Sequence, residues 1–159
     1  MAKVILMCGK ICAGKSTYAE KLRKENHAVV LSIDEITLAL FDQYGAGEKL
    51  DDYVARLEKY FFEKSVQIVE SGIDVIFDIG LWTKKERLEA REFYKNHNVE
   101  NEIHYIHLSN EEWQKRIKKR NVEINEGKIT AYYVDERLAD KVSEIFKEPE
   151  RSEVDVWVE

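Results

Sequence analysis

One segment constrains the fold more than any other: a continuous apolar run, a loop bounded by glycines and a helical pattern follow one another without a gap. Residues 4–8 are all apolar, which indicates a strand buried on both faces, as in a parallel sheet covered by helices. The next eight residues read GKICAGKS and match the pattern G-x-x-x-x-G-K-[ST]. A strand, this loop and a helix in that order predict a phosphate-binding loop.

The rest of the chain alternates between short apolar runs and longer helical patterns. Alternation of this kind predicts βαβ units with right-handed crossovers, and therefore an α/β fold built on a parallel sheet with helices on both faces. Thr83 with Glu86, and Ser109 with Glu112, have the spacing of a capping box at a helix start. The further strands are expected at residues 28–33, 74–77, 103–108 and 154–158, and the helices at 15–25, 35–44, 51–71, 84–97, 111–120 and 134–146.

Length and composition narrow the class of protein. A chain of 159 residues with a single proline is expected to form one domain, residues 1–159. The formal charge of −6 argues against a protein whose main task is to grip nucleic acid, because such binding is mostly neutralisation of phosphates by Lys and Arg. There is neither a signal-peptide pattern nor an apolar run of the roughly 20 residues that a membrane span needs. We therefore expect a protein of the cytoplasm, with Cys8 and Cys12 as reduced thiols.

Each part of the predicted loop has a role in binding ATP with Mg²⁺. The glycines let backbone N–H groups turn toward the β-phosphate, and the start of the following helix adds a favourable dipole. Lys15 supplies a charge to the β- and γ-phosphate oxygens, and the Ser16 hydroxyl is a ligand for Mg²⁺. The predicted nucleotide-binding residues are Gly9, Lys10, Ile11, Cys12, Ala13, Gly14, Lys15, Ser16 and Thr17.

Two carboxylates at predicted strand ends favour phosphoryl transfer over GTP or ATP hydrolysis. The chain has no Asn-Lys-x-Asp guanine signature, and Asp78 is not followed by the glutamate that a hydrolytic ATPase uses to activate water. Asp34 follows the strand at 28–33, on the side where α/β sheets bind ligands, and is our candidate general base. The alternative is that Asp34 only caps the helix starting at Glu35. Asp78 is predicted to assist Ser16 at the metal, the alternative being a solvated strand end.

A basic run, KRIKKR at residues 115–120, places Arg116 and Arg120 one helical turn apart on the same face. We interpret residues 113–132 as a mobile lid whose arginines contact the nucleotide and neutralise charge on the transferred phosphoryl group. A nucleic-acid patch and a solvated helix face are the alternatives. The polar stretch 121–130 is expected to be the moving loop, with Arg137 as a further contact.

With these residues assembled, the chain resembles the P-loop kinase group that includes polynucleotide kinase, zeta toxins and chloramphenicol phosphotransferase. The resemblance implies a five-stranded parallel sheet in the order 2-3-1-4-5. It also implies that Asp34 is the general base, that residues 78–87 form the second acidic motif, and that Arg116 and Arg120 are the lid arginines. The activity implied is transfer of the γ-phosphoryl group of ATP to a hydroxyl group.

The acceptor is expected to be a small polar molecule. Polynucleotide kinases carry an arginine three residues after the catalytic aspartate, and this chain has Thr37 there. Between Asp34 and Ser71 there are nine acidic residues against four basic ones, which would repel polyanions. An ATP-dependent sensor without an acceptor and a polynucleotide 5′-hydroxyl kinase remain as alternatives. The aromatic residues that could stack on an acceptor ring are Tyr44, Tyr53, Tyr60, Phe61, Phe62 and Trp82.

Overall fold

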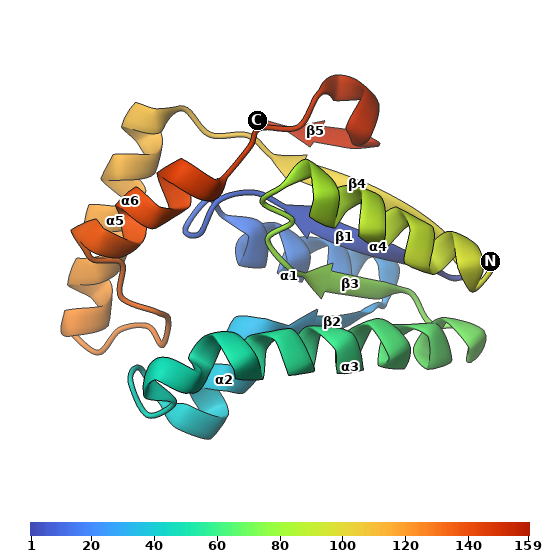
Figure 1. Cartoon of the computed structure of the whole chain (residues 1–159), viewed down its shortest axis with the longest axis horizontal. Helices are drawn as coiled ribbons and strands as arrows, with labels where there is room; N and C mark the ends of the chain where they lie inside the picture. Colours follow the sequence, from blue (N-terminus) through green and yellow to red (C-terminus); the bar gives the residue numbers. More distant parts are fainter.

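The computed structural model describes all of residues 1–159 and contains one five-stranded sheet (Figure 1). The strand order is β2-β3-β1-β4-β5, and every neighbouring pair is parallel. The predicted fold class is confirmed, and so is the sheet order that the resemblance implied. The strands are β1 (Lys3–Cys8), β2 (Val29–Ser32), β3 (Val75–Asp78), β4 (Glu100–Ile106) and β5 (Val156–Val158).

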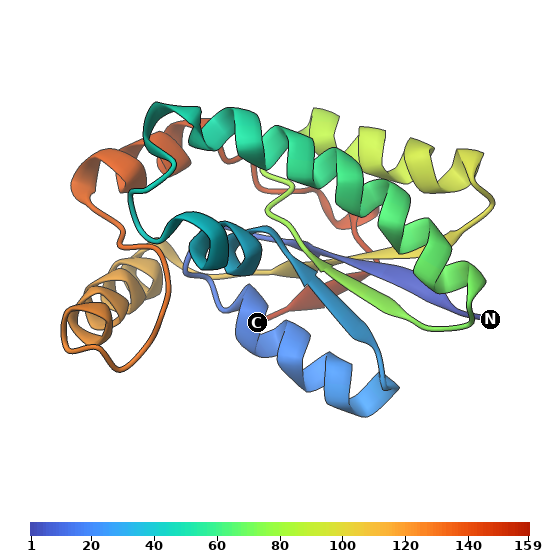
Figure 2. The ribbon, with the colours of Figure 1, turned by 90° about the horizontal axis from the view of Figure 1, so that it is seen from below.

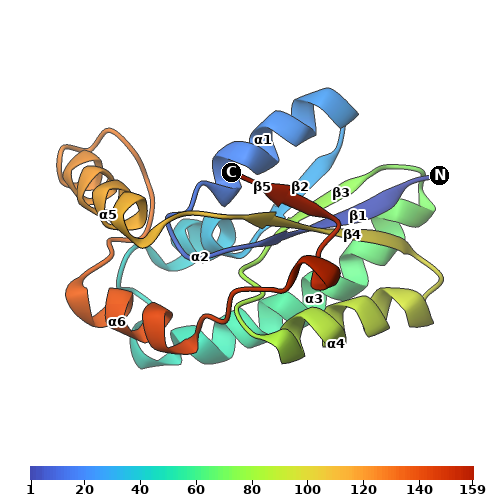
Figure 3. The same ribbon diagram turned by 90° about the horizontal axis from the view of Figure 1, so that it is seen from above.

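Helices cover both faces of the sheet. Helix α1 lies on one face, and α3 and α4 lie on the other (Figure 2). Helices α5 and α6 lie beyond the carboxyl ends of the strands, at the opposite end of the molecule from the N-terminus (Figure 3). The helices are α1 (Lys15–Asn26), α2 (Ile33–Phe41), α3 (Leu50–Glu70), α4 (Lys84–Asn96), α5 (Asn110–Asn125) and α6 (Glu136–Ile145), with short 3₁₀ turns at Gly47–Lys49 and Arg151–Glu153.

The apolar strand β1 is buried on both faces, as its lack of alternation predicted. Val4, Leu6 and Cys8 point into the larger core beneath α3 and α4, whereas Ile5 and Met7 point into the smaller core beneath α1. All five side chains are at most 1% exposed. Burying a large aliphatic side chain contributes about 1.5–3 kcal/mol, so β1 anchors both layers and fixes the position of the loop that follows it.

Each helix differs from its predicted range at one or both ends, and the largest differences are in α2 and α5. Helix α2 begins at Ile33, because the Ser32 hydroxyl accepts a hydrogen bond from the Glu35 backbone N–H at 3.2 Å and caps the helix. The interpretation of Asp34 as the cap is therefore wrong, and Asp34 lies within the first turn. Helix α5 continues to Asn125, so the first part of the expected moving loop is helical.

Of the two predicted capping boxes, the one at α4 is complete and the one at α5 is only partly formed. At α4 the box is complete, since Thr83 and Glu86 exchange both bonds. At α5 only the Ser109 hydroxyl takes part, accepting from the Glu112 backbone N–H at 3.2 Å. None of the helices combines the length and the apolar composition needed to cross a membrane.

Candidate active site

The loop between β1 and α1 curls around the Lys15 side chain. The Lys15 ammonium donates to the carbonyls of Gly9 and Lys10 at 3.1 and 2.8 Å, which holds it over the loop. Gly14 has φ 101°, and a Cβ placed there would lie 2.7 Å from Arg116 Nη1. Only glycine avoids both the backbone strain and this clash. The loop predicted from residues 9–16 is therefore a tight turn that leads directly into α1.

The two predicted metal ligands lie together. The Ser16 hydroxyl, at the start of α1, donates to Asp78 Oδ2 at 2.7 Å. Asp78 reaches this position because β3 lies next to β1 in the sheet and ends at the same edge. A hydroxyl and a carboxylate at this separation are hard oxygen donors of the kind that Mg²⁺ prefers.

Asp34 and Lys15 form the charged centre of the site. Although Asp34 is exposed to the solvent of a cavity, the surrounding protein removes part of its hydration and raises its pKa, an effect that the Lys15 charge opposes. Burial lowers the pKa of Lys15, and the carboxylates of Asp78 and Asp34 oppose that change. The three side chains thus influence one another's charge, as expected of groups gathered at one site.

Helix α5 contacts the phosphate loop through two side chains, and a third, Arg120, lies close enough for its charge to act on the site. The Trp113 indole N–H donates to the Ile11 carbonyl at 2.8 Å, and Arg116 Nη1 donates to the Ala13 carbonyl at 2.8 Å. Arg120 has a buried Nε without a hydrogen-bond partner, and its charge acts on both Lys15 and Asp34. Both predicted lid arginines therefore line the space over the phosphate loop.

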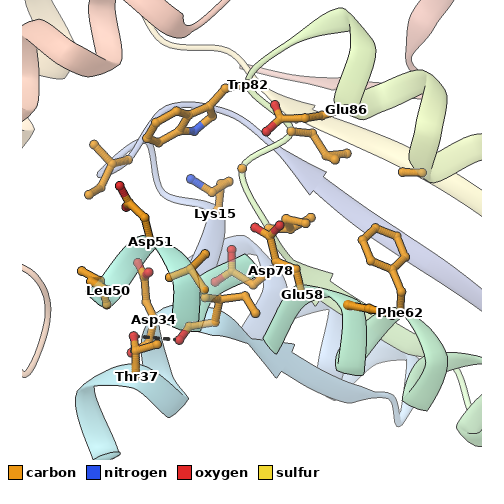
Figure 4. A pocket seen from close by; sticks show the side chains of 18 of the residues that line it. Lys15, Asp34, Thr37, Leu50, Asp51, Glu58, Phe62, Asp78, Trp82 and Glu86 are labelled. Carbon is orange, nitrogen blue, oxygen red and sulfur yellow. Dashed lines mark hydrogen bonds between the residues drawn. The ribbon is translucent and has the colours of Figure 1, made fainter. Parts of the chain in front are cut away.

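Two cavities meet at these residues. The first, of about 700 Å³, lies between α2, α3 and the segment after β3 (Figure 4). The second, of about 1180 Å³, lies over the phosphate loop between α1, α2 and α5. Four residues line both cavities: Ile11, Lys15, Asp34 and Asp78. Helices α3 and α4 wall much of the first cavity, called the acceptor cavity after its proposed role, whereas the phosphate loop and the α5 arginines line the second.

The end of the predicted lid, residues 131–133, makes contacts with α2 and Gln43 that the sequence did not predict. The Tyr132 hydroxyl donates to Thr37 Oγ1 at 2.7 Å, and Gln43 bonds to the backbone of Ala131 and Tyr133. Thr37 is 1% exposed and itself donates to the Ile33 carbonyl at 2.9 Å. The end of the expected lid is therefore bound to α2 beside Asp34. The partners in these contacts are about 90 residues apart in the chain, so no local sequence pattern could have predicted them.

Most of the remaining candidate residues, Arg137 and the six aromatic residues, lie outside the two cavities. Arg137 is exposed on α6 and lines neither cavity. Phe62 and Trp82 line the acceptor cavity, whereas Phe61 belongs to the core. Tyr53 stacks on Phe41, while Tyr44 and Tyr60 are exposed. Of the six aromatic residues considered for stacking, only two therefore face the acceptor cavity.

The sheet order, the phosphate loop and the helices on both faces define a P-loop fold of the kinase type. The AAA domain family matches residues 4–143 of the chain, which therefore belongs to that family. No curated protein matches the sequence.

Solved structures of similar fold include two kinases and a chain of an RNA repair complex. APS kinase from Mycobacterium tuberculosis, solved with AMPPNP and APS, has TM-score 0.68 at 16% identity, covering 99% of this chain and 87% of that one. A gluconokinase from Sinorhizobium meliloti has TM-score 0.68 at 14% identity, covering 98% and 81%. A chain of the Pnkp1/Rnl/Hen1 RNA repair complex has TM-score 0.70 at 21% identity, covering 91% of this chain and 44% of that one. At these identities the likeness shows the fold.

Proposed function

We propose that this protein is a small kinase that transfers the γ-phosphoryl group of ATP to a hydroxyl group of a small polar acceptor. One observation carries the proposal: the two cavities share Lys15, Asp34 and Asp78. A nucleotide over the phosphate loop and an acceptor in the other cavity would meet at these side chains. Kinases of similar fold act on small acceptors, as the names APS kinase and gluconokinase state.

In the proposed reaction, the acceptor hydroxyl oxygen bonds to the γ-phosphorus as the bond from that phosphorus to the bridging oxygen breaks. ADP departs with the electron pair of the broken bond, and the hydroxyl proton passes to Asp34 and then to solvent. Lys15, Arg116 and Arg120 neutralise the charge that spreads over the transferred group. The raised pKa of Asp34 improves it as a base, because a proton accepted there is held more tightly than at an ordinary aspartate.

Ser16 and Asp78 would hold Mg²⁺, and their oxygen donors fit that ion. When bound, Mg²⁺ neutralises negative charge on the β- and γ-phosphate oxygens. Residues 113–132 would act as the lid, and release of the Tyr132–Thr37 bond would open it. The acidic surroundings of the acceptor cavity and the buried Thr37 favour a small acceptor over a nucleic-acid end.

The decisive experiment compares Asp34→Asn with wild type in single-turnover phosphoryl transfer. The acceptor would come from an ADP-release screen of sugars, nucleosides, aminoglycosides and 5′-hydroxyl oligonucleotides. Asparagine keeps the shape but not the base, so transfer should fall by roughly 10²- to 10⁴-fold while ATP affinity stays the same. Asp52→Asn, an exposed change on α3 outside both cavities, is the control.

An Asp34→Asn enzyme as fast as wild type would remove Asp34 from the chemistry. A wild type that binds ATP but phosphorylates nothing in the screen would instead support a nucleotide-dependent sensor. Preferred transfer to the oligonucleotide would reassign the acceptor to a nucleic-acid end.

A further inference from the structure

The acceptor cavity is strongly acidic away from the reacting groups. Beyond Lys15, Asp34 and Asp78, five carboxylates line it against two lysines, Lys59 and Lys141. The five come from two helices that face each other across the cavity: Asp51, Glu58 and Glu63 from α3, and Glu86 and Glu89 from α4. Any acceptor in this cavity therefore meets an excess of negative charge.

Three of these carboxylates have partners within the protein, whereas Glu58 and Glu63 have none, and of these two only Glu58 is half-buried. Asp51 lies 3.9 Å from Lys141, and Glu89 lies 3.7 Å from Lys85. Glu86 accepts two hydrogen bonds from Thr83 as part of the α4 cap. Burial and, to a smaller extent, the Glu86 charge together raise the pKa of Glu58 to about 7, and neither a hydrogen bond nor a positive charge opposes the change. Glu58 is thus a half-buried carboxylate open to a partner from the cavity.

The walls beside Glu58 are aromatic. Phe62, Phe93 and Trp82 line the same cavity, and the rings of Phe62 and Phe93 meet edge to face with centroids 5.1 Å apart. Figure 4 shows Glu58, Phe62, Trp82 and Glu86 around one hollow with Lys15 and Asp34. Aromatic faces attract organic cations through their quadrupoles, and the attraction grows when the cation loses water. Carboxylates and aromatic rings together are the surroundings in which ammonium groups bind.

A metal ion fits the acidic side chains of this cavity less well than an organic cation does. No three Asp, Glu, His or Cys side chains are grouped closely enough to hold a metal ion. A cavity of about 700 Å³ is also the size of a small-molecule site. Both observations favour an organic ligand.

We propose that the acceptor is a hydroxylated organic cation, whose ammonium group is held by Glu58, with support from Glu86, while its hydroxyl lies at Asp34. This inference rests on the proposed kinase function and names its substrate class. The protonated amine has no free electron pair, so the phosphoryl group goes to the hydroxyl oxygen and the ammonium group keeps its proton throughout. Glu58 is a specificity-determining residue in this arrangement, because it contacts the part of the acceptor that does not react.

The test uses acceptors that differ in charge and little else. ADP release is measured with glucosamine, its uncharged analogue N-acetylglucosamine and the anion gluconate, and with kanamycin against fully N-acetylated kanamycin. The amines should have kcat/KM values at least about tenfold above those of their acetylated counterparts. Glu58→Gln should remove that preference mainly through KM, whereas Glu58→Asp should keep part of it. Glu70→Gln, on α3 but outside both cavities, should behave as wild type.

Calorimetric titration of kanamycin into the AMPPNP-bound protein separates this inference from the proposed function. Binding that Glu58→Gln weakens, without phosphorylation of any acceptor, would support the cation site and overturn the kinase. Preferred phosphorylation of gluconate or of the acetylated analogues would support the kinase and overturn the cation site. Preference for the amines that survives Glu58→Gln would also overturn the role of Glu58. Neither binding nor transfer would overturn both.

Discussion

At the scale of single residues, the site brings like charges close together beside charges of the opposite sign. Lys15 and Arg120 influence each other as like charges, and so do Asp34 and Asp78. Glu58 and Glu86 are a further pair of like charges in the acceptor cavity. Like charges held close together repel each other and destabilise the folded state. A bound ligand of opposite charge offsets that repulsion. These residues therefore identify the positions where ligands carrying phosphate and ammonium groups would stabilise the protein.

Glu58 gives a prediction about stability and pH. Its folded pKa of about 7 lies above the ordinary value of 4.5, so the folded state holds this proton more tightly than the unfolded state. The stability gained from the proton is complete below about pH 4.5 and is lost as the pH rises through 7. Glu58→Gln should therefore be more stable than wild type at pH 8, by on the order of 1 to 3 kcal/mol, and nearly equal to it at pH 4.

Urea unfolding of both proteins across this pH range measures the difference. The same Glu70→Gln variant serves as the control, because its effect should not change with pH in this way. A difference between Glu58→Gln and wild type that is constant from pH 4 to pH 8 would show that Glu58 titrates as an ordinary glutamate.

At the scale of elements, α5 is hydrogen-bonded both to the phosphate loop and to the segment around Val134. Trp113 and Arg116 bond to loop carbonyls, and Lys10 lies 4.5 Å from the centre of the Trp113 ring. Asn121, the residue after Arg120, exchanges two hydrogen bonds with the backbone of Val134 and closes the loop that follows the helix. Movement of α5 would therefore carry the arginines and the segment around Tyr132 together.

Arg116 and Arg120 should act mainly on the transition state. Replacing either arginine with alanine should lower kcat far more than it raises the KM for ATP. The expected decrease in kcat is about 10³-fold if these residues resemble arginine fingers. Steady-state kinetics with the acceptor from the screen give both constants. Lys118→Ala is the matched control, because Lys118 is exposed on α5 and lines neither cavity. Wild-type kcat in both arginine variants would mean that this run of bases is only a solvated helix face.

At the scale of the whole molecule, the end of the chain supports the acceptor cavity. Arg87 is 2% exposed, pairs with Glu153 at 3.0 Å and donates to the Leu81 carbonyl at 2.9 Å. Leu81 lies in the segment after β3 that lines the cavity. A buried ion pair that loses one partner leaves an uncompensated charge, so this contact holds the C-terminal segment, α4 and the cavity wall in one arrangement.

Ligand binding should therefore stabilise the entire fold. At 100 times its Kd, Mg·ATP adds about 2.7 kcal/mol, which corresponds to a Tm increase of roughly 5–10 °C for a chain of this size. Chelating Mg²⁺ with EDTA should reduce the increase, and Lys15→Ala should abolish it because the loop loses its charge toward the β- and γ-phosphates. Differential scanning fluorimetry measures each shift. A full shift in Lys15→Ala, whose unliganded Tm serves as the folding control, would place the nucleotide elsewhere.

The local features of this protein follow from its sequence, since they depend on residues that are neighbours in the chain. The phosphate loop is eight consecutive residues between a buried strand and a helix, and the α4 capping box spans four. The positions of Asp34 and Asp78 near the carboxyl ends of strands were also predictable, because parallel strands end at one edge of the sheet. The order of the strands came from the family resemblance, since alternation alone does not state which strands pair.

Features that depend on contacts between distant segments of the chain were determined only by the tertiary structure. Ser32 rather than Asp34 caps α2, because the chain turns from β2 into the helix without a linker. The Tyr132–Thr37 bond joins residues 95 positions apart. The raised pKa of Glu58 requires burial in a cavity and a carboxylate brought across it on another helix. Sequence periodicity describes which face of an element is buried, whereas the surroundings of a cavity arise only when elements from several parts of the chain meet.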